Sequence, residues 1–259
     1  MLPHFTNISN RYAYDESGPT NYIEIDVVII SNAKTPELVK VTEDCVISLL
    51  QSESQIRFNV YIIESTEHEY HSLKSYFAKQ VNGRQLNIYY CIHPNEEFGY
   101  NKFLNKGIEL GHSDYVVLCN NDLIFHHGWA SSIWNAMNKD EYLMSASPFE
   151  EKVHPLIWGL QANTGLKYGY KTGKDITGWC IFTKRKLFDI IGKLDEQFIF
   201  WCADDDYAKT LEVNNIKHAL VTYSFVDHVE SKTLNTIEPT EYKKYTTEQY
   251  STFNKKWNR

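Results

Sequence analysis

Apolar and polar stretches alternate regularly along the first half of the 259-residue chain. Residues 23–30 begin with alternating apolar and polar positions and become continuously apolar, which is typical of a strand buried on both faces of a parallel sheet. Thr35-Pro36 follows a short polar loop and begins a helix, because proline is favoured at the first helical position. Apolar residues of this helix recur at helical spacing, at Leu38, Val41, Cys45 and Leu49.

The alternation continues to about residue 119 and predicts a mainly parallel central sheet flanked by helices, joined by right-handed crossovers. Ligands of such sheets lie beyond the carboxyl ends of the strands. Ser31-Asn32, Glu64 and Asn120-Asn121-Asp122 are predicted to meet there. The further strands are predicted at 59–64, 85–92 and 115–119, and the helices at 67–80 and 100–110.

The second half of the chain is less regular. Residues 148–176 show no clear period and predict a long functional loop, and residues 1 to about 20 predict a polar arm. The remaining pattern predicts helices at 129–138, 185–191 and 204–213, and strands at 142–147, 178–183, 217–222 and 225–228.

Composition indicates one α/β domain, with 42% hydrophobic and 23% charged residues. The net charge of −7 argues against a dedicated nucleic-acid binder, which usually carries a basic surplus. Residues 242–259 are nevertheless basic and aromatic, and we interpret them as a solvated terminal helix.

The five cysteines are scattered without a C-x-x-C pair, which predicts buried free thiols and a cytoplasmic protein. The N-terminus has neither the basic nor the apolar region of a signal peptide. No apolar run approaches the ~18–20 residues that a membrane span needs.

Two strand ends carry residues with metal chemistry. Asn120-Asn121-Asp122 closes a buried strand, and a carboxylate there must be paired. Asp122 therefore either caps the next turn or meets a metal ion. His228 ends a later apolar strand, and it is either a core histidine or a second ligand beside Asp122.

Asp204-Asp205-Asp206 begins a predicted helix after an apolar segment. Adjacent carboxylates repel, which raises the pKa of at least one of them unless a cation or a helix N-terminus compensates. The cluster is either an N-terminal cap favoured by the helix dipole or a general base beside a substrate hydroxyl. Earlier in the chain, the helix opened by Gly99 offers N-terminal amides to a phosphate, although it lacks a Walker or G-x-G-x-x-G pattern.

Taken in order, these pieces resemble a family 2-type glycosyltransferase with the GT-A fold, over residues from about 25 to about 231. Gly99, Asn105 and Gly107 match the family's N-x-G-x-x-x-x-R-N-x-G pattern, in which Glu97 replaces the leading Asn. The residues 178–185 and 192–196 match its middle pattern of a Gly-containing strand, a basic helix, Gly and an acidic pair.

The acidic motifs of the family fall on the candidates already named. Asn120-Asn121-Asp122 represents the D-x-D motif with Asn as its first acid, and Ala203-Asp204-Asp205-Asp206 represents Glu-Asp-x-Asp with Ala203 in place of Glu. The late metal-side histidine maps to His228. The resemblance implies that Asp122 and His228 hold Mn²⁺ or Mg²⁺. It also implies that Asp204 is the catalytic base, or Asp205 after a slip of one residue.

The resemblance further implies one GT-A domain over 1–259, with a nucleotide-sugar-binding half at about 20–125 and an acceptor-binding, catalytic half at about 126–259. The implied reaction is an inverting, metal-dependent transfer of a sugar from a nucleotide-diphosphate sugar to an acceptor hydroxyl. A UDP-sugar is the donor that we expect. The implied donor-binding residues are Ser31, Asn32, Glu64, Gly99, Asn105, Asn120 and Asn121. The implied acceptor-binding residues are Trp179, Trp201 and Asp206, and the alternative for the two tryptophans is core packing.

The amino-acid sequences of residues 119–125, 203–208 and 231–234 also resemble small soluble glycosyltransferases of bacteriophages. This second resemblance implies either a glycan acceptor or, for a phage enzyme in the host cytoplasm, a hydroxymethylated DNA base. Basic and aromatic residues at 148–176 and Lys255-Lys256-Trp257 suit DNA, whereas the alternative for 148–176 is a mobile lid over the donor.

Two other functions stay open from the sequence. Ala203 in place of Glu favours a catalytically inactive module that binds a sugar nucleotide or a glycan. A nucleotidyltransferase also combines a parallel sheet with a metal, although Ser31-Asn32-Ala33-Lys34 is not its Gly-rich first loop.

Overall fold

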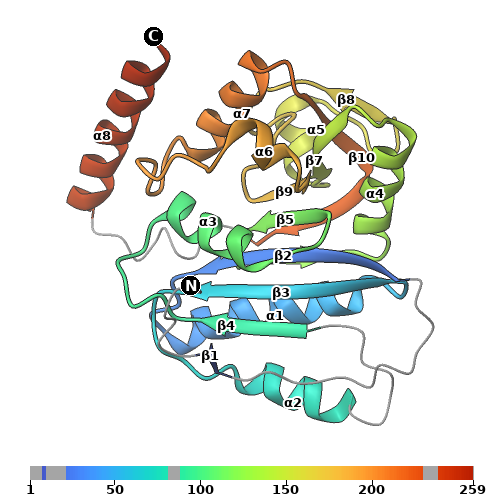
Figure 1. Ribbon diagram of the computed structural model, residues 1–259, viewed down its shortest axis with the longest axis vertical. Helices are drawn as coiled ribbons and strands as arrows, with labels where there is room; N and C mark the ends of the chain where they lie inside the picture. Colours follow the sequence, from blue (N-terminus) through green and yellow to red (C-terminus); the bar gives the residue numbers. More distant parts are fainter. Residues whose placement is uncertain (1–7, 10–21, 81–87, 230–238, 259) are drawn as a thin grey trace.

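The computed structural model describes residues 8–9, 22–80, 88–229 and 239–258 (Figure 1). Within them ten strands form a sheet in the order β1-β4-β3-β2-β5-β9-β7-β10-β6, and β8 pairs with β10 beside this path. The strands are β1 Ile8–Ser9, β2 Ile23–Ser31, β3 Ile56–Glu64, β4 Ile88–Ile92, β5 Tyr115–Cys119, β6 Leu123–Phe125, β7 Leu143–Phe149, β8 Leu166–Tyr168, β9 Cys180–Lys184 and β10 Lys217–His228. The helices are α1 Pro36–Gln51, α2 His71–Gln80, α3 Tyr100–Leu110, α4 Trp129–Lys139, α5 Val153–Trp158, α6 Leu187–Ile191, α7 Ala203–Val213 and α8 Pro239–Trp257.

The strands β2 to β5 are parallel, as predicted, and the short β1 is antiparallel to β4 at the edge of the sheet. β2 lies between β3 and β5 and is parallel to both, and β3 is parallel to β4. The second half is mixed, because β9 is antiparallel to both β5 and β7. Because β7 and β9 are antiparallel neighbours, the segment between them returns to the end of the sheet that it left, and no crossover is needed.

Each face of the sheet carries its own apolar core. Val27 and Ile29 of β2 point to one face and pack with α1, α2 and α4. Val28 and Ile30 point to the other face and pack with α3, α6 and α7. Figure 1 shows α1 and α3 on opposite sides of the strands. This double burial explains why β2 is continuously apolar.

The local start of α1 follows its sequence closely. Thr35 has extended backbone angles, and its hydroxyl accepts a hydrogen bond from the Leu38 amide at 3.4 Å. Pro36 is the first helical residue and has no amide hydrogen to satisfy. The helix therefore begins directly after the loop that follows β2.

Several predicted bounds differ from the structure. The predicted loop 148–176 contains α5 and β8, and β6 was not predicted at all. The two strands predicted at 217–228 are one strand, β10, whose register shifts between Val221 and Phe225. α2 begins at His71 rather than at 67. Most of the predicted arm and residues 85–87 of the predicted third strand lie outside the described residues.

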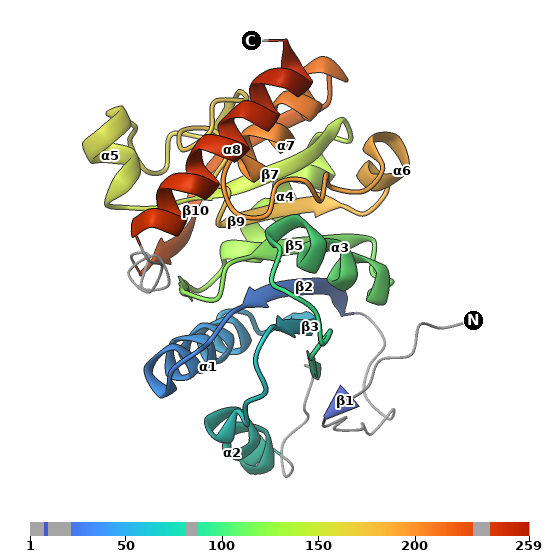
Figure 2. The same ribbon diagram turned by 90° about the vertical axis from the view of Figure 1, so that its left-hand side faces the viewer.

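The five cysteines are buried and free, as predicted. No helix within the described part of the chain is long and apolar enough to cross a membrane. The predicted terminal helix is present as α8, but it is not simply solvated. In Figure 2 it passes in front of α7, and Phe253 of α8 packs against Phe198, with ring centroids 6.3 Å apart.

Candidate functional site

The carboxyl ends of β2, β3 and β5 converge through buried side chains, as predicted. Asn121 Nδ2 donates to the Ser31 hydroxyl at 3.1 Å and to the Thr42 hydroxyl at 2.8 Å. These bonds join the turn after β5 to β2 and α1. Asn32 Oδ1 accepts from the Ser65 hydroxyl at 2.6 Å, which joins the loops after β2 and β3. Thr42 was not among the predicted residues, because a helix-interior threonine carries no distinguishing sequence signal.

Glu64 is fully buried, and both of its carboxylate oxygens are occupied within the protein. Oε1 accepts from the Ala33 amide at 3.1 Å and from the Thr66 amide at 3.0 Å. Oε2 accepts from the Tyr70 hydroxyl at 2.6 Å. Glu64 therefore shapes the loop after β2, in which Asn32 lies.

The predicted α3 residues hold the helix in place. Asn105 is buried; its Nδ2 donates to the Leu194 carbonyl and to Glu196 Oε1, both at 2.9 Å, and its Oδ1 accepts from the Leu194 amide. A Cβ atom on Gly107 would lie 2.2 Å from Cγ1 of Val28, so this glycine permits close packing of α3 on β2. Gly99 is the N-cap of α3.

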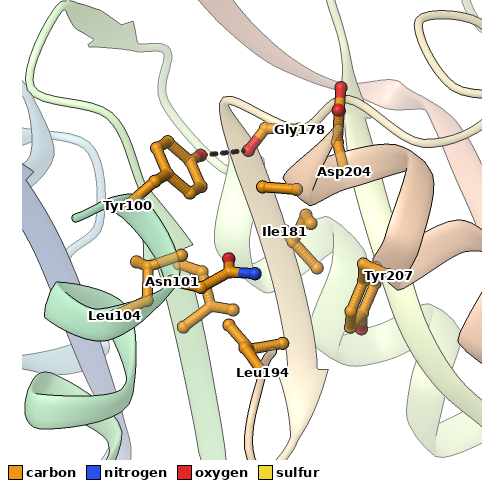
Figure 3. Close-up of a pocket in the computed structure, with 10 residues that line it drawn as sticks. Tyr100, Asn101, Leu104, Gly178, Ile181, Leu194, Asp204 and Tyr207 are labelled. Carbon is orange, nitrogen blue, oxygen red and sulfur yellow. Dashed lines mark hydrogen bonds between the residues drawn. The ribbon is translucent and has the colours of Figure 1, made fainter. Parts of the chain in front are cut away.

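Tyr100 connects the turn after β5 to the chain just before β9, and it was not predicted. Its hydroxyl lies 3.0 Å from Asn120 Oδ1 and 2.9 Å from the Gly178 carbonyl oxygen, so its one proton is shared between two acceptors (Figure 3). The Asn120 amide in turn donates to the Trp179 carbonyl at 3.0 Å. Burial, together with the nearby charge of Asp204, raises the pKa of Tyr100, so the phenol stays protonated.

Asp122 and His228 meet at the carboxyl edge of the sheet. Nε2 of His228 lies 3.1 Å from Oδ1 of Asp122. Both atoms are buried, and neither makes a hydrogen bond to any residue that the structure describes. The two atoms contact each other as an ion pair but make no hydrogen bond within the described residues, and buried polar atoms without hydrogen bonds are costly unless a further group binds between or beside them. A carboxylate oxygen and an imidazole nitrogen are suitable ligands for Mn²⁺, so these residues fit a divalent metal.

The elements around this pair hold it in position. The Trp179 ring stacks on the His228 ring, with centroids 5.5 Å apart and planes 14° apart. The Val229 amide donates to the Asp122 carbonyl at 2.8 Å. Within the described ranges no group of three or more His, Cys, Asp or Glu side chains could hold a metal ion. Any metal held by Asp122 and His228 therefore needs further ligands from outside this set of described side chains.

A second group of titratable residues, not predicted from the sequence, flanks His228. Glu150 follows β7 and is 2% exposed, and its Oε2 has no hydrogen-bond partner among the described residues. Burial and then the charge of Asp227 raise the pKa of Glu150, whereas His228 lowers it. His126 Nε2 lies 3.0 Å from Asp227 Oδ2.

Asp204 lies in the first turn of α7 and is partly buried. Burial, followed by repulsion from Asp205, raises the pKa of Asp204 to about 6. Its neighbour across the site is Gly178, whose lack of a side chain lets α7 approach the chain just before β9. In Figure 3 the Asp204 carboxylate points away from the apolar side chains of Ile181 and Leu194. A carboxylate in this setting suits a general base near neutral pH.

The other predicted residues of this region contact protein groups. Asp206 is buried, and its carboxylate oxygens receive bonds from Lys256 Nζ and Trp257 Nε1 of α8. Trp201 is partly buried and packs edge-on against Phe200, with centroids 5.0 Å apart. Asp205 is partly buried, and its amide donates to Asp204 Oδ1 at 3.0 Å. The structure thus separates Asp204 from Asp206, which the sequence placed in one cluster.

Comparisons with known proteins agree with this architecture. The family model for glycosyl transferase family 2 matches residues 26–190. No curated protein matches the chain with significance.

Among solved structures, GalNAc-T7 with UDP, GalNAc and Mn²⁺ is 12% identical with a TM-score of 0.57, over 80% of this chain and 43% of that chain. The mannosyltransferase PcManGT from Pyrobaculum calidifontis, in complex with GDP-Man and Mn²⁺, is 14% identical with a TM-score of 0.58, over 82% of this chain and 59% of that chain. The match therefore covers less than two thirds of either protein's length. At these identities the likeness shows the fold.

Proposed function

Because the chain belongs to glycosyl transferase family 2, we propose that this glycosyltransferase moves a sugar, with inversion, from a UDP-sugar to an acceptor hydroxyl. The observation that carries the proposal is the buried contact between Asp122 Oδ1 and His228 Nε2, two atoms that make no hydrogen bond to the described residues. They lie at the edge of the sheet where ligands of open α/β folds bind. Asp204, a carboxylate with a raised pKa, belongs to the separate helix α7.

Asp122 and His228 would hold Mn²⁺ or Mg²⁺ against the donor diphosphate. A bound divalent ion neutralises charge that develops on the departing diphosphate. The stacked Trp179 ring keeps the His228 imidazole in one orientation. The hydrogen bond from the Asn120 backbone N–H to the Trp179 carbonyl fixes the turn that carries Asp122. Both solved neighbours described above contain Mn²⁺, which supports the choice of a divalent ion for this chain.

Asp204 would accept the proton of the acceptor hydroxyl. As that proton leaves, the acceptor oxygen forms a bond to the anomeric carbon on one face of the sugar while the bond to the diphosphate breaks on the other, which inverts the configuration. A pKa of about 6 leaves Asp204 mostly ionised at neutral pH while keeping it more basic than an exposed carboxylate. Positioned bases of this kind contribute roughly 10²–10⁴-fold to the rate.

The donor half would bind the nucleoside through residues near the carboxyl ends of β2 and β5. Asn32 and Asn120 are partly exposed there, whereas Ser31, Glu64 and Asn121 are buried and shape the surrounding loops. The two solved neighbours contain UDP and GDP-mannose. We propose a UDP-sugar for this chain on the family resemblance.

For the acceptor we favour a glycan hydroxyl over a hydroxymethylated DNA base. The net charge is −7, and Lys256 and Trp257, which would suit DNA, already bind Asp206. The observation that keeps DNA as a second candidate is the basic, aromatic surface near α5, where Lys171 Nζ lies 4.3 Å from the Trp158 ring centroid. The bacteriophage origin and the cytoplasmic setting stay predictions of the sequence.

Ala203, the feature that favoured an inactive binding module, has a packing role. It is 6% exposed and lies in an apolar cluster with Phe198, Cys202 and Phe253. A glutamate at this position would place a carboxylate among those side chains. The substitution therefore leaves Asp204 as the first acid of α7 that faces Gly178, which supports an active enzyme.

The test is a panel of nucleotide sugars with Mn²⁺ and no added acceptor. A ligand that binds the native state raises its apparent stability, so the true donor should stand out by thermal shift. We expect slow release of UDP from the same donor, because water replaces the acceptor. Stabilisation by a donor without any hydrolysis would instead support the binding module.

A further inference from the structure

The end of α8 contacts the chain segment that leads into α7. Lys256 Nζ lies 2.8 Å from Asp195 Oδ2 and 2.8 Å from Asp206 Oδ1, so one ammonium joins the start of this segment to the first turn of α7. Trp257 Nε1 donates to Asp206 Oδ1 at 2.8 Å. The Asp206 side chain is only 6% exposed. A carboxylate so buried depends on these partners.

Gln249, about two helical turns before Lys256 on α8, holds the middle of the same segment. Its Oε1 accepts from the Ile199 amide at 2.9 Å, and its Nε2 donates to the Gln197 carbonyl at 3.0 Å. The Ile199 carbonyl accepts from the Tyr100 amide at 2.9 Å. The segment is therefore fixed between α8 on one side and α3 on the other.

Cys202 shows why this segment needs outside support. It precedes α7 directly and has a φ of 58°, in the left-handed region that residues with a side chain rarely adopt. Such a conformation persists where the surroundings determine it. Cys202 is buried in the cluster that Phe253 and Trp257 of α8 complete. Because Asp204 follows two residues later, the backbone angles of Cys202 decide where its carboxylate lies.

We infer that Lys256 and Trp257 are positioning residues that act through Asp206 to hold Asp204 in place. The inference rests on the proposed function, in which Asp204 is the base. It assigns Asp206 to the anchoring of α7 rather than to the acceptor, because both of its oxygens are occupied by α8. It also makes α8, which lies beyond the matched residues 26–190, part of the machinery of this chain.

The experiment compares Lys256→Met with its matched control Lys255→Met. Lys255 is exposed on the same turn of α8, so both variants lose one positive charge at the same place. For each variant, we would measure turnover of the donor identified above, the Kd of UDP with Mn²⁺, and amide hydrogen exchange at 199–206. Lys256→Arg is the conservative variant, because a guanidinium also bridges two carboxylates.

In Lys256→Met we expect turnover to fall by about 10- to 100-fold, the scale of a displaced catalytic group, with the Kd of UDP unchanged. Exchange at 199–206 should rise, Lys256→Arg should restore most of the turnover, and Lys255→Met should match the wild type. Trp257→Phe keeps an aromatic ring and removes the hydrogen bond to Asp206. The same measurements can therefore be made on this variant if Lys256→Met does not fold.

Unchanged turnover in a folded Lys256→Met or Trp257→Phe enzyme would overturn the positioning role alone. Unchanged exchange at 199–206 would overturn it whatever the activity. A wild type that neither binds nor hydrolyses any nucleotide sugar would instead overturn the proposed function, and the exchange measurement would still show whether α8 holds the segment.

Discussion

Gly178 and Asp204 approach each other so closely that a Cβ atom on Gly178 would lie 2.6 Å from the Cβ atom of Asp204. The candidate base, Asp204, thus packs directly against the backbone of Gly178. The same glycine gives its carbonyl oxygen to the Tyr100 hydroxyl. Gly178 therefore contacts both the candidate base and the tyrosine whose hydroxyl also reaches Asn120 (Figure 3).

Gly178→Ala should reduce turnover while leaving the affinity for UDP and Mn²⁺ nearly unchanged. The added methyl group pushes α7 and Asp204 away, and misplacing a catalytic group by about 1 Å can cost on the order of 10²-fold in rate. Steady-state kinetics with calorimetry would separate the two effects. Wild-type turnover in a folded Gly178→Ala protein would show that Asp204 does not act from its present place.

Asp122→Ala should abolish the metal-dependent part of UDP binding, because it removes the only acid of the Asn-Asn-Asp turn. His228→Ala should weaken it by at least about 10-fold, since even second-shell changes cost 10–100-fold in metal affinity. Calorimetry with UDP, with and without Mn²⁺, measures both. Equal affinity for UDP and Mn²⁺ in Asp122→Ala and wild type would remove the metal role of this pair.

Asp204→Asn should keep donor affinity and lose roughly 10²–10⁴-fold in turnover, because an amide cannot accept the proton. Asp205→Asn is the matched control, one residue away and also partly buried. We expect it to keep most of its turnover. The reverse result, an inactive Asp205→Asn and an active Asp204→Asn, would move the base by one residue.

Turnover should rise with pH through about 6, because Asp204 has a pKa of about 6 and must be ionised to accept a proton. Asp205→Asn should shift this rise to lower pH, since the charge of Asp205 helps to raise that pKa. A pH profile of kcat with the identified donor checks both. An unshifted rise in Asp205→Asn would mean that another group controls the profile.

The same pKa predicts a stability effect of definite sign. The folded pKa of Asp204 exceeds its ordinary value of 3.8, so the native state binds this proton more tightly than the unfolded state. The contribution of Asp204 to stability therefore falls as pH rises from about 4 to about 6. Asp204→Asn should gain thermal stability relative to wild type over this range. A difference in Tm that does not change with pH would contradict the raised pKa.

Duplex DNA bearing hydroxymethylcytosine should not bind with a steep salt dependence, because two of the basic and aromatic groups that suit DNA are engaged with Asp206. Fluorescence anisotropy across a salt series, with and without UDP-sugar, measures this. Affinity that falls steeply with added salt would indicate counterion release and favour the DNA acceptor.

The sequence alone determined the parallel half of the fold and the ends of its strands. Continuous apolar runs such as β2, separated by helices with their own caps, leave little choice of arrangement. Since parallel strands present their carboxyl ends at one edge, Ser31, Glu64 and Asn121 were predicted to meet. Ser31 lies beside Glu64 in the β2–β3 ladder and accepts a hydrogen bond from Asn121. Local pattern was sufficient because the apolar run of each strand and the cap and spacing of each helix lie within one short segment of the chain.

The tertiary structure alone decided which candidates share a site and which hold it together. Asp204 and Asp206 are two residues apart in sequence, yet one lies against Gly178 and the other is buried beneath Lys256 and Trp257. Three further features depend on segments that are distant in the chain. They are the antiparallel β9, the contact of Asp122 Oδ1 with His228 Nε2 without a hydrogen bond among the described residues, and the bonds of Tyr100. Such relationships arise from burial and from hydrogen bonds across the sheet, and no periodicity of a single segment encodes them.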